Sequence, residues 1–245
     1  MNDQFVIIVP ARSGSTRLPN KPLSMINGRT LISRVLDLAK SSQASDIYVA
    51  TDSNEIKEHV ESIGINVVMT SSNHISGMDR IAEAANILNL DINTSIVNLQ
   101  GDEPFMPVNI INQLPTFLSE EIHISTACIK FTNEMDVSSQ HEVKVTRSNS
   151  KRAMYFSRSV IPNSFSRDYK NYMKHLGIYS YKNKTLQMLT KLDPSSNEKD
   201  ENLEQLRFLD NGFNIYVQDY DCKPPIGVDT AEDLKAAIKY AVNND

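Results

Sequence analysis

Strand-like and helix-like segments alternate four times within the first hundred residues, and this alternation restricts the fold more than any other feature. The segments 5–9, 47–50, 66–69 and 95–99 are short and mostly apolar, as buried parallel strands are. Between them, residues 30–40, 53–63 and 78–90 carry apolar side chains at helical spacing, and Gly64 is well placed to end the second helix. The pattern predicts an α/β fold with a mostly parallel sheet, right-handed crossovers and helices on both faces.

The second half of the chain is less regular. Strands are expected over residues 122–131, 143–146, 176–181 and 214–217, and helices over 203–210 and 230–242. Residues 148–174 are rich in Ser, Arg, Asn and Tyr and show little periodicity, which indicates a loop or a small lobe over the sheet. Because no linker divides the chain, we predict a single domain, 1–245, in which about 142–200 form a small lobe.

Composition excludes several classes of protein. Lys and Arg number 25 against 30 Asp and Glu, and the net charge of −5 argues against a nucleic-acid partner. No apolar run approaches the ~20 residues of a membrane span, so no membrane insertion is expected. Cys128 and Cys222 lie far apart and lack the spacing of metal ligands. We therefore expect a cytoplasmic protein with reduced thiols.

The turn after the first strand gathers positive charge around a glycine. Residues 10–22 read P-A-R-S-G-S-T-R-L-P-N-K-P and contain Arg12, Arg17 and Lys21. Backbone N–H groups near Gly14 can form an anion-binding nest, to which these side chains add charge. Because open α/β sheets bind ligands at the carboxyl ends of their strands, the turn predicts a polyphosphate site. It matches neither the Walker loop nor the G-x-G-x-x-G dinucleotide turn, which disfavours kinase-like and dehydrogenase functions.

The turn after the fourth strand supplies carboxylates. Residues 98–104 read N-L-Q-G-D-E-P, in which Asp102 is a candidate ligand of Mg²⁺ bound to phosphates, and Glu103 is more simply an acid of the turn. A further carboxylate, Asp229, precedes the last helix. From the residues alone, Asp229 is more simply the start of that helix, because Thr230 and Asp233 have the spacing of a capping box.

These motifs resemble those of the bacterial 3-deoxy-manno-octulosonate (KDO) cytidylyltransferases. The turn P-A-R-S-G-S-T-R-L-P-N-K-P-L is similar to the family's opening signature, and Q-G-D-E-P, G-V-D-T-x-E-D-L and H-I-S-G-M-D-R are similar to later motifs. The resemblance runs from Phe5 to Leu234 and implies a Rossmann-like nucleotidyltransferase fold. Three positions depart from the family: Ser13 stands for a frequent Tyr, Asn20 for Gly and Met78 for Thr. Because Asn tolerates the left-handed conformation, the turn at position 20 can be kept.

The resemblance also implies the activity and the site. It implies that CTP and KDO are joined to give CMP-KDO and pyrophosphate for lipopolysaccharide or capsule synthesis, in a homodimer. Mg²⁺ is expected on Asp102 and Asp229, and the residues with catalytic roles would be Arg12, Lys21, Asp102 and Asp229. The expected nucleotide-binding residues are Ala11, Arg12, Ser13, Gly14, Arg17, Lys21, Thr51, Ser76, Gly77, Arg80 and Gln100. The expected sugar-binding residues are Arg158, His175, Tyr179, Glu204 and Gln205. The first three belong to the lobe at about 142–200, which is expected to serve sugar binding and dimerisation.

Alternatives remain at this stage. The sugar could be 8-amino-KDO or a nonulosonic acid, although Thr16 and Arg17 replace the S-K pair usual in sialic-acid synthetases. A catalytically silent nucleotide-binding protein is a third alternative, which the presence of both candidate metal carboxylates disfavours. On residue chemistry alone, His175 is more simply explained as a structural histidine. Glu204 and Gln205 are then part of an acidic helix whose other charges form a solvated face.

Overall fold

The structure of this protein is a computed structural model that describes residues 4–14, 18–74, 76–166 and 168–245. The chain forms two compact units. The first comprises Met1–Gln113 and Pro225–Asp245, and the second comprises Leu114–Pro224. The lobe expected over 142–200 lies within the second unit, and each unit is described by itself below.

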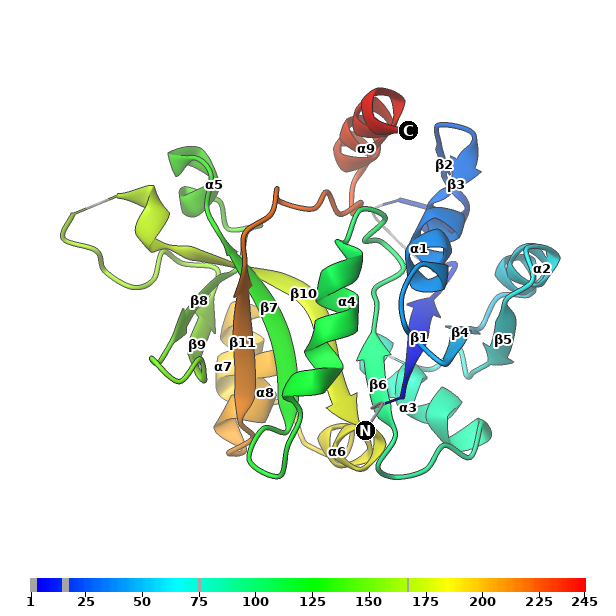
Figure 1. The fold of residues 1–245 in the computed structure, drawn as a ribbon, viewed down its shortest axis with the longest axis horizontal. Coiled ribbons are helices and arrows are strands. Elements are labelled where there is room, and N and C mark those ends of the chain that lie inside the picture. The colour runs from blue at the N-terminus through cyan, green and yellow to red at the C-terminus, as the bar shows by residue number, and fades with distance from the viewer. Residues whose placement is uncertain (1–3, 15–17, 75, 167) are drawn as a thin grey trace. The chain divides into compact units, whose positions relative to one another are not determined.

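Four parallel strands form the sheet of the first unit within the described part of the chain. β1 (Phe5–Ala11) pairs with β6 (Ser95–Asn98) on one side and with β4 (Asp46–Thr51) on the other, and β5 (Asn66–Met69) pairs with β4. Figure 1 shows them in the order β6-β1-β4-β5. All four lie within two residues of the segments that the sequence predicted, so the parallel sheet is confirmed.

The connections of this sheet place the helices. α1 (Leu31–Lys40) and α2 (Asn54–Ser62) lead from β1 to β4 and on to β5, whereas α3 (Gly77–Ile87) leads back past β1 to β6. Right-handed crossovers therefore set α1 and α2 on one face and α3 on the other. The strand order reverses between β1 and β6, which is where sheets of this kind bind ligands at the strands' carboxyl ends.

Local sequence begins and ends these helices. The side chains of Thr30, Ser53 and Ser76 each accept a backbone hydrogen bond at the start of α1, α2 and α3. Gly64, with a φ of +76°, follows the end of α2. The remaining elements of the unit are η1 (Lys21–Leu23), β2 (Met25–Ile26), β3 (Arg29–Thr30), α4 (Val108–Gln113) and α9 (Ala231–Asn244).

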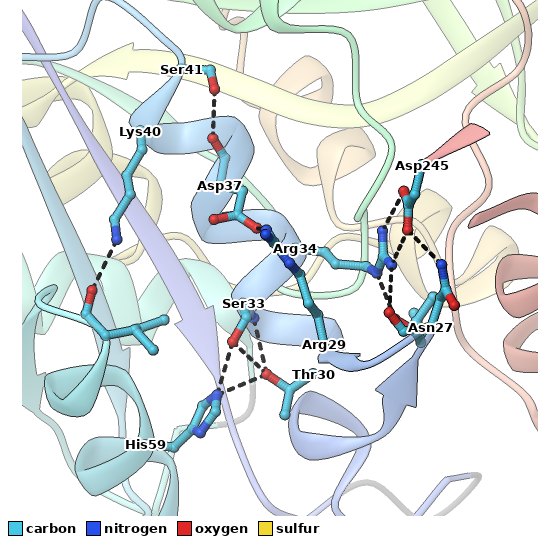
Figure 2. Close-up of polar contacts among 12 residues, drawn as sticks. Asn27, Arg29, Thr30, Ser33, Arg34, Asp37, Lys40, Ser41, His59 and Asp245 are labelled. Atoms are coloured by element: carbon cyan, nitrogen blue, oxygen red, sulfur yellow. Dashed lines mark hydrogen bonds and ion pairs between the residues drawn. The ribbon is translucent and has the colours of Figure 1, made fainter. Parts of the chain in front are cut away.

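Polar contacts fix α1 to its neighbours (Figure 2). The His59 Nε2 atom of α2 lies 2.8 Å from the Thr30 hydroxyl and 2.9 Å from the Ser33 hydroxyl. The Arg34 guanidinium of α1 donates to both carboxylate oxygens of Asp245, at 2.6 and 3.1 Å, and to the carbonyl oxygen of Ile26 at 2.9 Å. These bonds from Arg34 lower the pKa of the Asp245 carboxyl to about 2. The far end of α9 is thus anchored to α1.

The second unit is built around the strand β7 (Ile124–Lys130). β10 (Met173–Lys182) pairs with it antiparallel, and β11 (Ile215–Tyr220) pairs with it parallel. β8 (Lys144–Arg147) pairs antiparallel with β10 and with β9 (Ala153–Ser157). The helical elements are η2 (Leu114–Phe117), α5 (Glu134–Ser138), η3 (Tyr169–Asn171), α6 (Asn183–Leu189), α7 (Ser196–Glu201) and α8 (Gln205–Asp210).

One strand of this unit was not predicted. The segment 148–174 was predicted to be a loop or a small lobe, and it contains β9. β9 reads A-M-Y-F-S, and this short apolar run lies within a polar segment that shows little periodicity, so it did not stand out in the sequence. The hairpin with β8, a tertiary pairing, determines its conformation.

Two further expectations concern the thiols and the membrane. Cys128 and Cys222 are both free, as the sequence predicted, and burial raises the pKa of the Cys128 thiol to about 12. In the part of the chain that the structure describes, no helix combines the length and the apolar character that crossing a membrane requires.

The turn after β6 passes close to the end of β1 and requires glycine. A Cβ atom on Gly101 would lie 2.9 Å from the carbonyl oxygen of Pro10, a backbone atom that cannot turn aside. We expect Gly101→Ala to lower the free energy of unfolding by about 1–3 kcal/mol, because overpacking forces the backbone to shift. Urea unfolding measures this loss.

Gly77→Ala is the matched control, because its Cβ meets nothing closer than 3.4 Å at the start of α3. That control should retain the stability of the parent protein. Equal stability of the two variants would contradict the close approach of the two turns.

Candidate functional site

A polar cavity lies at the carboxyl ends of β1 and β6 in the first unit, where the strand order reverses. Its volume is about 280 Å³. Nine of the residues that line it were expected from the sequence: Ala11, Arg12, Lys21, Ser76, Gly77, Arg80, Gln100, Asp102 and Asp229. Four were not among the expected site residues: Pro10, Pro22, His74 and Gly101. The first strand, the turn after β6, the start of α3 and the segment before α9 therefore meet in one cavity.

Lys21 and two carboxylates form the centre of this cavity. The Lys21 ammonium donates to Asp102 Oδ2 at 2.6 Å and to Asp229 Oδ1 at 2.9 Å. The Lys21 side chain is 15% exposed, whereas Asp102 is 31% and Asp229 52% exposed. Burial alone would lower the pKa of Lys21, but the charge of Asp102 and the hydrogen bonds to both carboxylates outweigh it, and the pKa is raised. Lys21 is therefore a permanent cation held between two acids.

Backbone geometry brings these three groups together. Asn20, directly before Lys21, adopts the left-handed conformation with a φ of +52°, as expected where Asn replaces Gly. The backbone N–H of Val228 donates to the carbonyl oxygen of Asp102 at 2.9 Å, which joins the turn after β6 to the segment before α9. This bond sets both carboxylates at the same end of the sheet.

Asp229 both belongs to the start of α9 and faces the cavity. Thr230 and Asp233 form a capping box at the start of α9, and the Asp233 carboxylate also accepts from the backbone N–H of Asp229 at 3.1 Å. The cap uses only the backbone of Asp229. Its side chain points instead to Lys21, so one short segment starts the helix and supplies an acid to the cavity.

Groups that attract anions line another part of the wall. Arg12 is exposed, and within the described residues no carboxylate pairs with it. Ser76 and Gly77 stand at the N-terminus of the eleven-residue helix α3, where backbone N–H groups and the helix dipole favour negative charge. The Gln100 side chain donates to Asn98 Oδ1 at 3.1 Å and faces the same space. Such a wall suits a phosphate chain.

Arg80 lines the cavity and also connects separate segments of the first unit through hydrogen bonds. Its guanidinium donates to Thr70 Oγ1 at 2.6 Å and to Asp52 Oδ2 at 2.7 Å, and the residue is only 2% exposed. It therefore binds α3 to the ends of β4 and β5. His74, which the sequence motif contained but the prediction omitted, contacts Glu83 Oε2 at 2.6 Å. Burial alone would raise the pKa of Glu83, but the hydrogen bonds from His74 and the Ser71 N–H lower it.

Other expected nucleotide-binding residues are not part of this cavity wall. Thr51 is fully buried and accepts from the backbone N–H of Ser53 at 3.2 Å. Ser13 and Gly14 are exposed beyond Arg12. Arg17 lies outside the described residues. Met78, where the family has Thr, is 4% exposed and does not line the cavity, so the lost hydroxyl removes no group from this wall.

The expected sugar-binding residues belong to the second unit. On β10, the ring centres of His175 and Tyr179 lie 5.5 Å apart. Burial, together with the charge of Glu204 directly before α8, raises the pKa of Tyr179 well above its usual value. Gln205 is 6% exposed. His175, Tyr179 and Glu204 are thus brought together as predicted, at the point where a register shift interrupts the pairing of β10 with β7.

His175 is an uncharged member of this cluster. Its Nε2 atom lies 2.9 Å from the Thr126 hydroxyl, and the residue is 8% exposed. Its ring packs against that of Phe156 in an edge-to-face arrangement, with ring centres 4.8 Å apart. Burial lowers its pKa to about 3. A neutral imidazole can donate or accept a hydrogen bond but offers no positive charge to a carboxylate.

Arg158 is the cation of the predicted sugar set, and main-chain oxygens hold it. Its guanidinium donates to the carbonyl oxygens of Glu201 at 2.8 Å, Gln140 at 3.0 Å and Asn202 at 3.3 Å. The buried Lys144 ammonium in turn donates to the Arg158 carbonyl oxygen at 2.5 Å. These contacts engage three of the five guanidinium donors, which leaves two for a ligand as far as the described residues are concerned.

The fold and the cavity together define a class of enzyme. The chain matches the model of the family described as "Cytidylyltransferase" over residues 6–219. A parallel sheet with cations facing two carboxylates at its point of strand reversal agrees with that match. The protein is therefore a nucleotidyltransferase.

Individual relatives narrow the class. A 3-deoxy-manno-octulosonate cytidylyltransferase of Polynucleobacter necessarius subsp. necessarius (strain STIR1) is 45% identical over 238 residues, 94% of this chain and 93% of that protein. One from Idiomarina loihiensis is 40% identical, covering 97% and 98%. The structure of a CMP:2-keto-3-deoxy-manno-octonic acid synthetase complexed with CTP superposes with a TM-score of 0.92 at 33% identity, covering 99% of this chain and all of that one. The chain belongs to the 3-deoxy-manno-octulosonate cytidylyltransferase family.

The neutral state of buried His175 makes the stability of the protein depend on pH. Native His175 stays neutral down to about pH 3, while the unfolded residue protonates near 6.5, so between these values the unfolded state binds more protons. The contribution is complete above pH 6.5 and is lost as the pH falls below it, by about 1.4 kcal/mol per pH unit. Urea unfolding at pH 7 and pH 5 measures the difference.

Two variants isolate the effect. His175→Gln should make the loss between pH 7 and pH 5 smaller by about 2 kcal/mol, because no imidazole remains to protonate over the 1.5 pH units below 6.5. His141→Gln, at an exposed position, should leave it unchanged. If His175→Gln and the parent protein lost stability equally, the histidine would be charged in the native state.

Proposed function

We propose that this protein transfers the cytidylyl group of CTP to KDO, giving CMP-KDO and pyrophosphate. One observation carries the proposal: Lys21, Asp102 and Asp229 converge in the cavity where the strand order reverses, beside the exposed Arg12. The relatives named for this activity align with nearly the whole chain, which supports both substrates. In the reaction the anomeric hydroxyl of the sugar attacks the α-phosphorus in line with the departing pyrophosphate.

The groups of this chain act by position and charge. Arg12 and Lys21 would neutralise the triphosphate, and the N-terminus of α3 at Ser76 and Gly77 would receive the nucleotide. Arg17, outside the described residues, is proposed to add to the same charge. No residue needs to form a covalent bond, because orienting the two substrates and stabilising the charge that develops lower the barrier.

The two carboxylates suit Mg²⁺. Asp102 and Asp229 both direct an oxygen at one cation, the Lys21 ammonium, so the protein already holds a positive charge where a metal ion is expected. Within the described residues, no group of three or more His, Cys, Asp or Glu side chains is arranged so that it could hold a metal ion. A site with two carboxylates fits Mg²⁺, which takes its other ligands from water and phosphate. When bound, Mg²⁺ polarises the phosphate and lowers the pKa of the attacking hydroxyl.

For the sugar we propose the cluster of the second unit. Arg158 has two free donors for the carboxylate of an acid sugar, and His175, Tyr179, Glu204 and Gln205 offer neutral and anionic partners for its hydroxyls. The contacts of Arg158 with three main-chain oxygens support a fixed cation rather than a mobile one.

Three finer proposals accompany the activity. We propose a homodimer, because the second unit exposes large apolar side chains: Met135, Met154, Val160 and Phe165. We propose the cytoplasm as its location, because that compartment supplies the nucleoside triphosphate. We propose that the product serves lipopolysaccharide or capsule synthesis, in keeping with the family. Sedimentation of the purified protein tests the first.

Pyrophosphate release from CTP and KDO with Mg²⁺ tests the activity. Asp102→Asn and Asp229→Asn should each lower kcat by about 100-fold or more, because each removes a carboxylate proposed to hold the Mg²⁺ that stabilises the charge of the transition state. Glu61→Gln removes from α2 a carboxylate as exposed as that of Asp229, and it should leave kcat unchanged. Circular dichroism confirms that all three variants are folded.

A panel of sugars tests the substrate. Release with KDO well above that with 8-amino-KDO or a sialic acid supports the proposal. Release only with one of the other acids would assign the activity to that sugar. Binding of CTP without pyrophosphate release from any of them would contradict it and favour a silent nucleotide-binding protein.

A further inference from the structure

Lys21 occupies the position in which the two acids of the cavity converge. Its ammonium lies 2.6 Å from Asp102 Oδ2 and 2.9 Å from Asp229 Oδ1, both of them charge-assisted hydrogen bonds. Of the three side chains it is the least exposed, at 15%. A cation that satisfies one oxygen of each carboxylate stands where a metal ion bound by both would stand.

We propose that Lys21 holds this position only in the nucleotide-free protein, and that it exchanges the carboxylates for the triphosphate when CTP binds. Tight metal binding then depends on the nucleotide. This inference rests on the proposed function, since it concerns the same cavity and the same substrates.

Electrostatics makes the exchange necessary. Asp102 and Asp229 carry two negative charges, and Lys21 already cancels one of them. A divalent ion that entered beside the ammonium would meet a like charge within a few ångströms. The free protein should therefore bind divalent metal weakly. Moving the ammonium away removes this repulsion.

The cavity provides another partner for the ammonium. Arg12 and the N-terminus of α3 attract phosphate to the same space, as described above. A lysine is a mobile point charge on four rotatable bonds, so Lys21 can turn from carboxylate to phosphate without moving the backbone. After this rotation, the Lys21 ammonium no longer contacts Asp102 and Asp229. The bound phosphate oxygens are then in place to complete the shell of a metal ion. By linkage, bound metal must then also favour the nucleotide.

Mn²⁺ binding to the nucleotide-free protein tests the inference, with electron paramagnetic resonance counting the free ion. Lys21→Met should bind Mn²⁺ at least about tenfold more tightly than the parent, because the competing charge is gone. Lys57→Met, which removes an exposed lysine from α2, should match the parent. Mn²⁺ should also raise the melting temperature of Lys21→Met by more than that of the parent.

The double variant Lys21→Met with Asp102→Asn assigns the site, since it should lose the gained affinity. Equal Mn²⁺ affinity of the parent and Lys21→Met would overturn the inference, as would a gain that survives in the double variant. No turnover occurs in these measurements. Failure of pyrophosphate release by the parent protein would therefore count against the proposed activity, and failure here counts against the exchange of Lys21.

Discussion

The contact between one ammonium and two carboxylates is the interaction on which the cavity depends. Lys21, Asp102 and Asp229 come from three segments that lie far apart in the sequence: the turn after β1, the turn after β6 and the segment before α9. Without the lysine, two acids would face each other in a partly buried space, which is costly. Without the acids, a mostly buried ammonium would lack partners.

The rest of the first unit keeps these segments in place. Gly101 allows the turn after β6 to pass the Pro10 carbonyl, and the Val228 N–H binds the Asp102 carbonyl oxygen. α9 packs through Ala237 and Ala241 in a cluster with Ile26, Leu31 and Val228. Asp245, directly after α9, is bound by Arg34, so both ends of the helix are fixed. Rigid elements thus position the side chains that line the cavity.

Much of the first unit could be predicted because its signals are local. The apolar run of β1, the cap at Ser53 and Gly64 each act within a few residues, so sequence spacing reveals them. The strand β9 escaped prediction because its pairing with β8, rather than its own periodicity, holds it extended. The parallel sheet then determines where the turns after β1 and β6 meet.

The site was harder to predict in its contacts than in its residues. Motif resemblance brought Lys21, Asp102 and Asp229 into one list, but only the fold shows that they touch. For Arg80 the resemblance implied only a nucleotide role, and the fold adds that its guanidinium also joins Asp52 to Thr70. His175 is uncharged because it is buried. Its burial depends on packing among several strands, which no local sequence pattern reveals.

A crystal structure with CTP and Mn²⁺ bound tests the central claim most directly, because anomalous scattering locates the metal ion. The account predicts Mn²⁺ in contact with the carboxylates of both Asp102 and Asp229, and the Lys21 ammonium on a phosphate oxygen. Mn²⁺ bound away from these acids, or Lys21 still bridging them with the nucleotide in place, would contradict it.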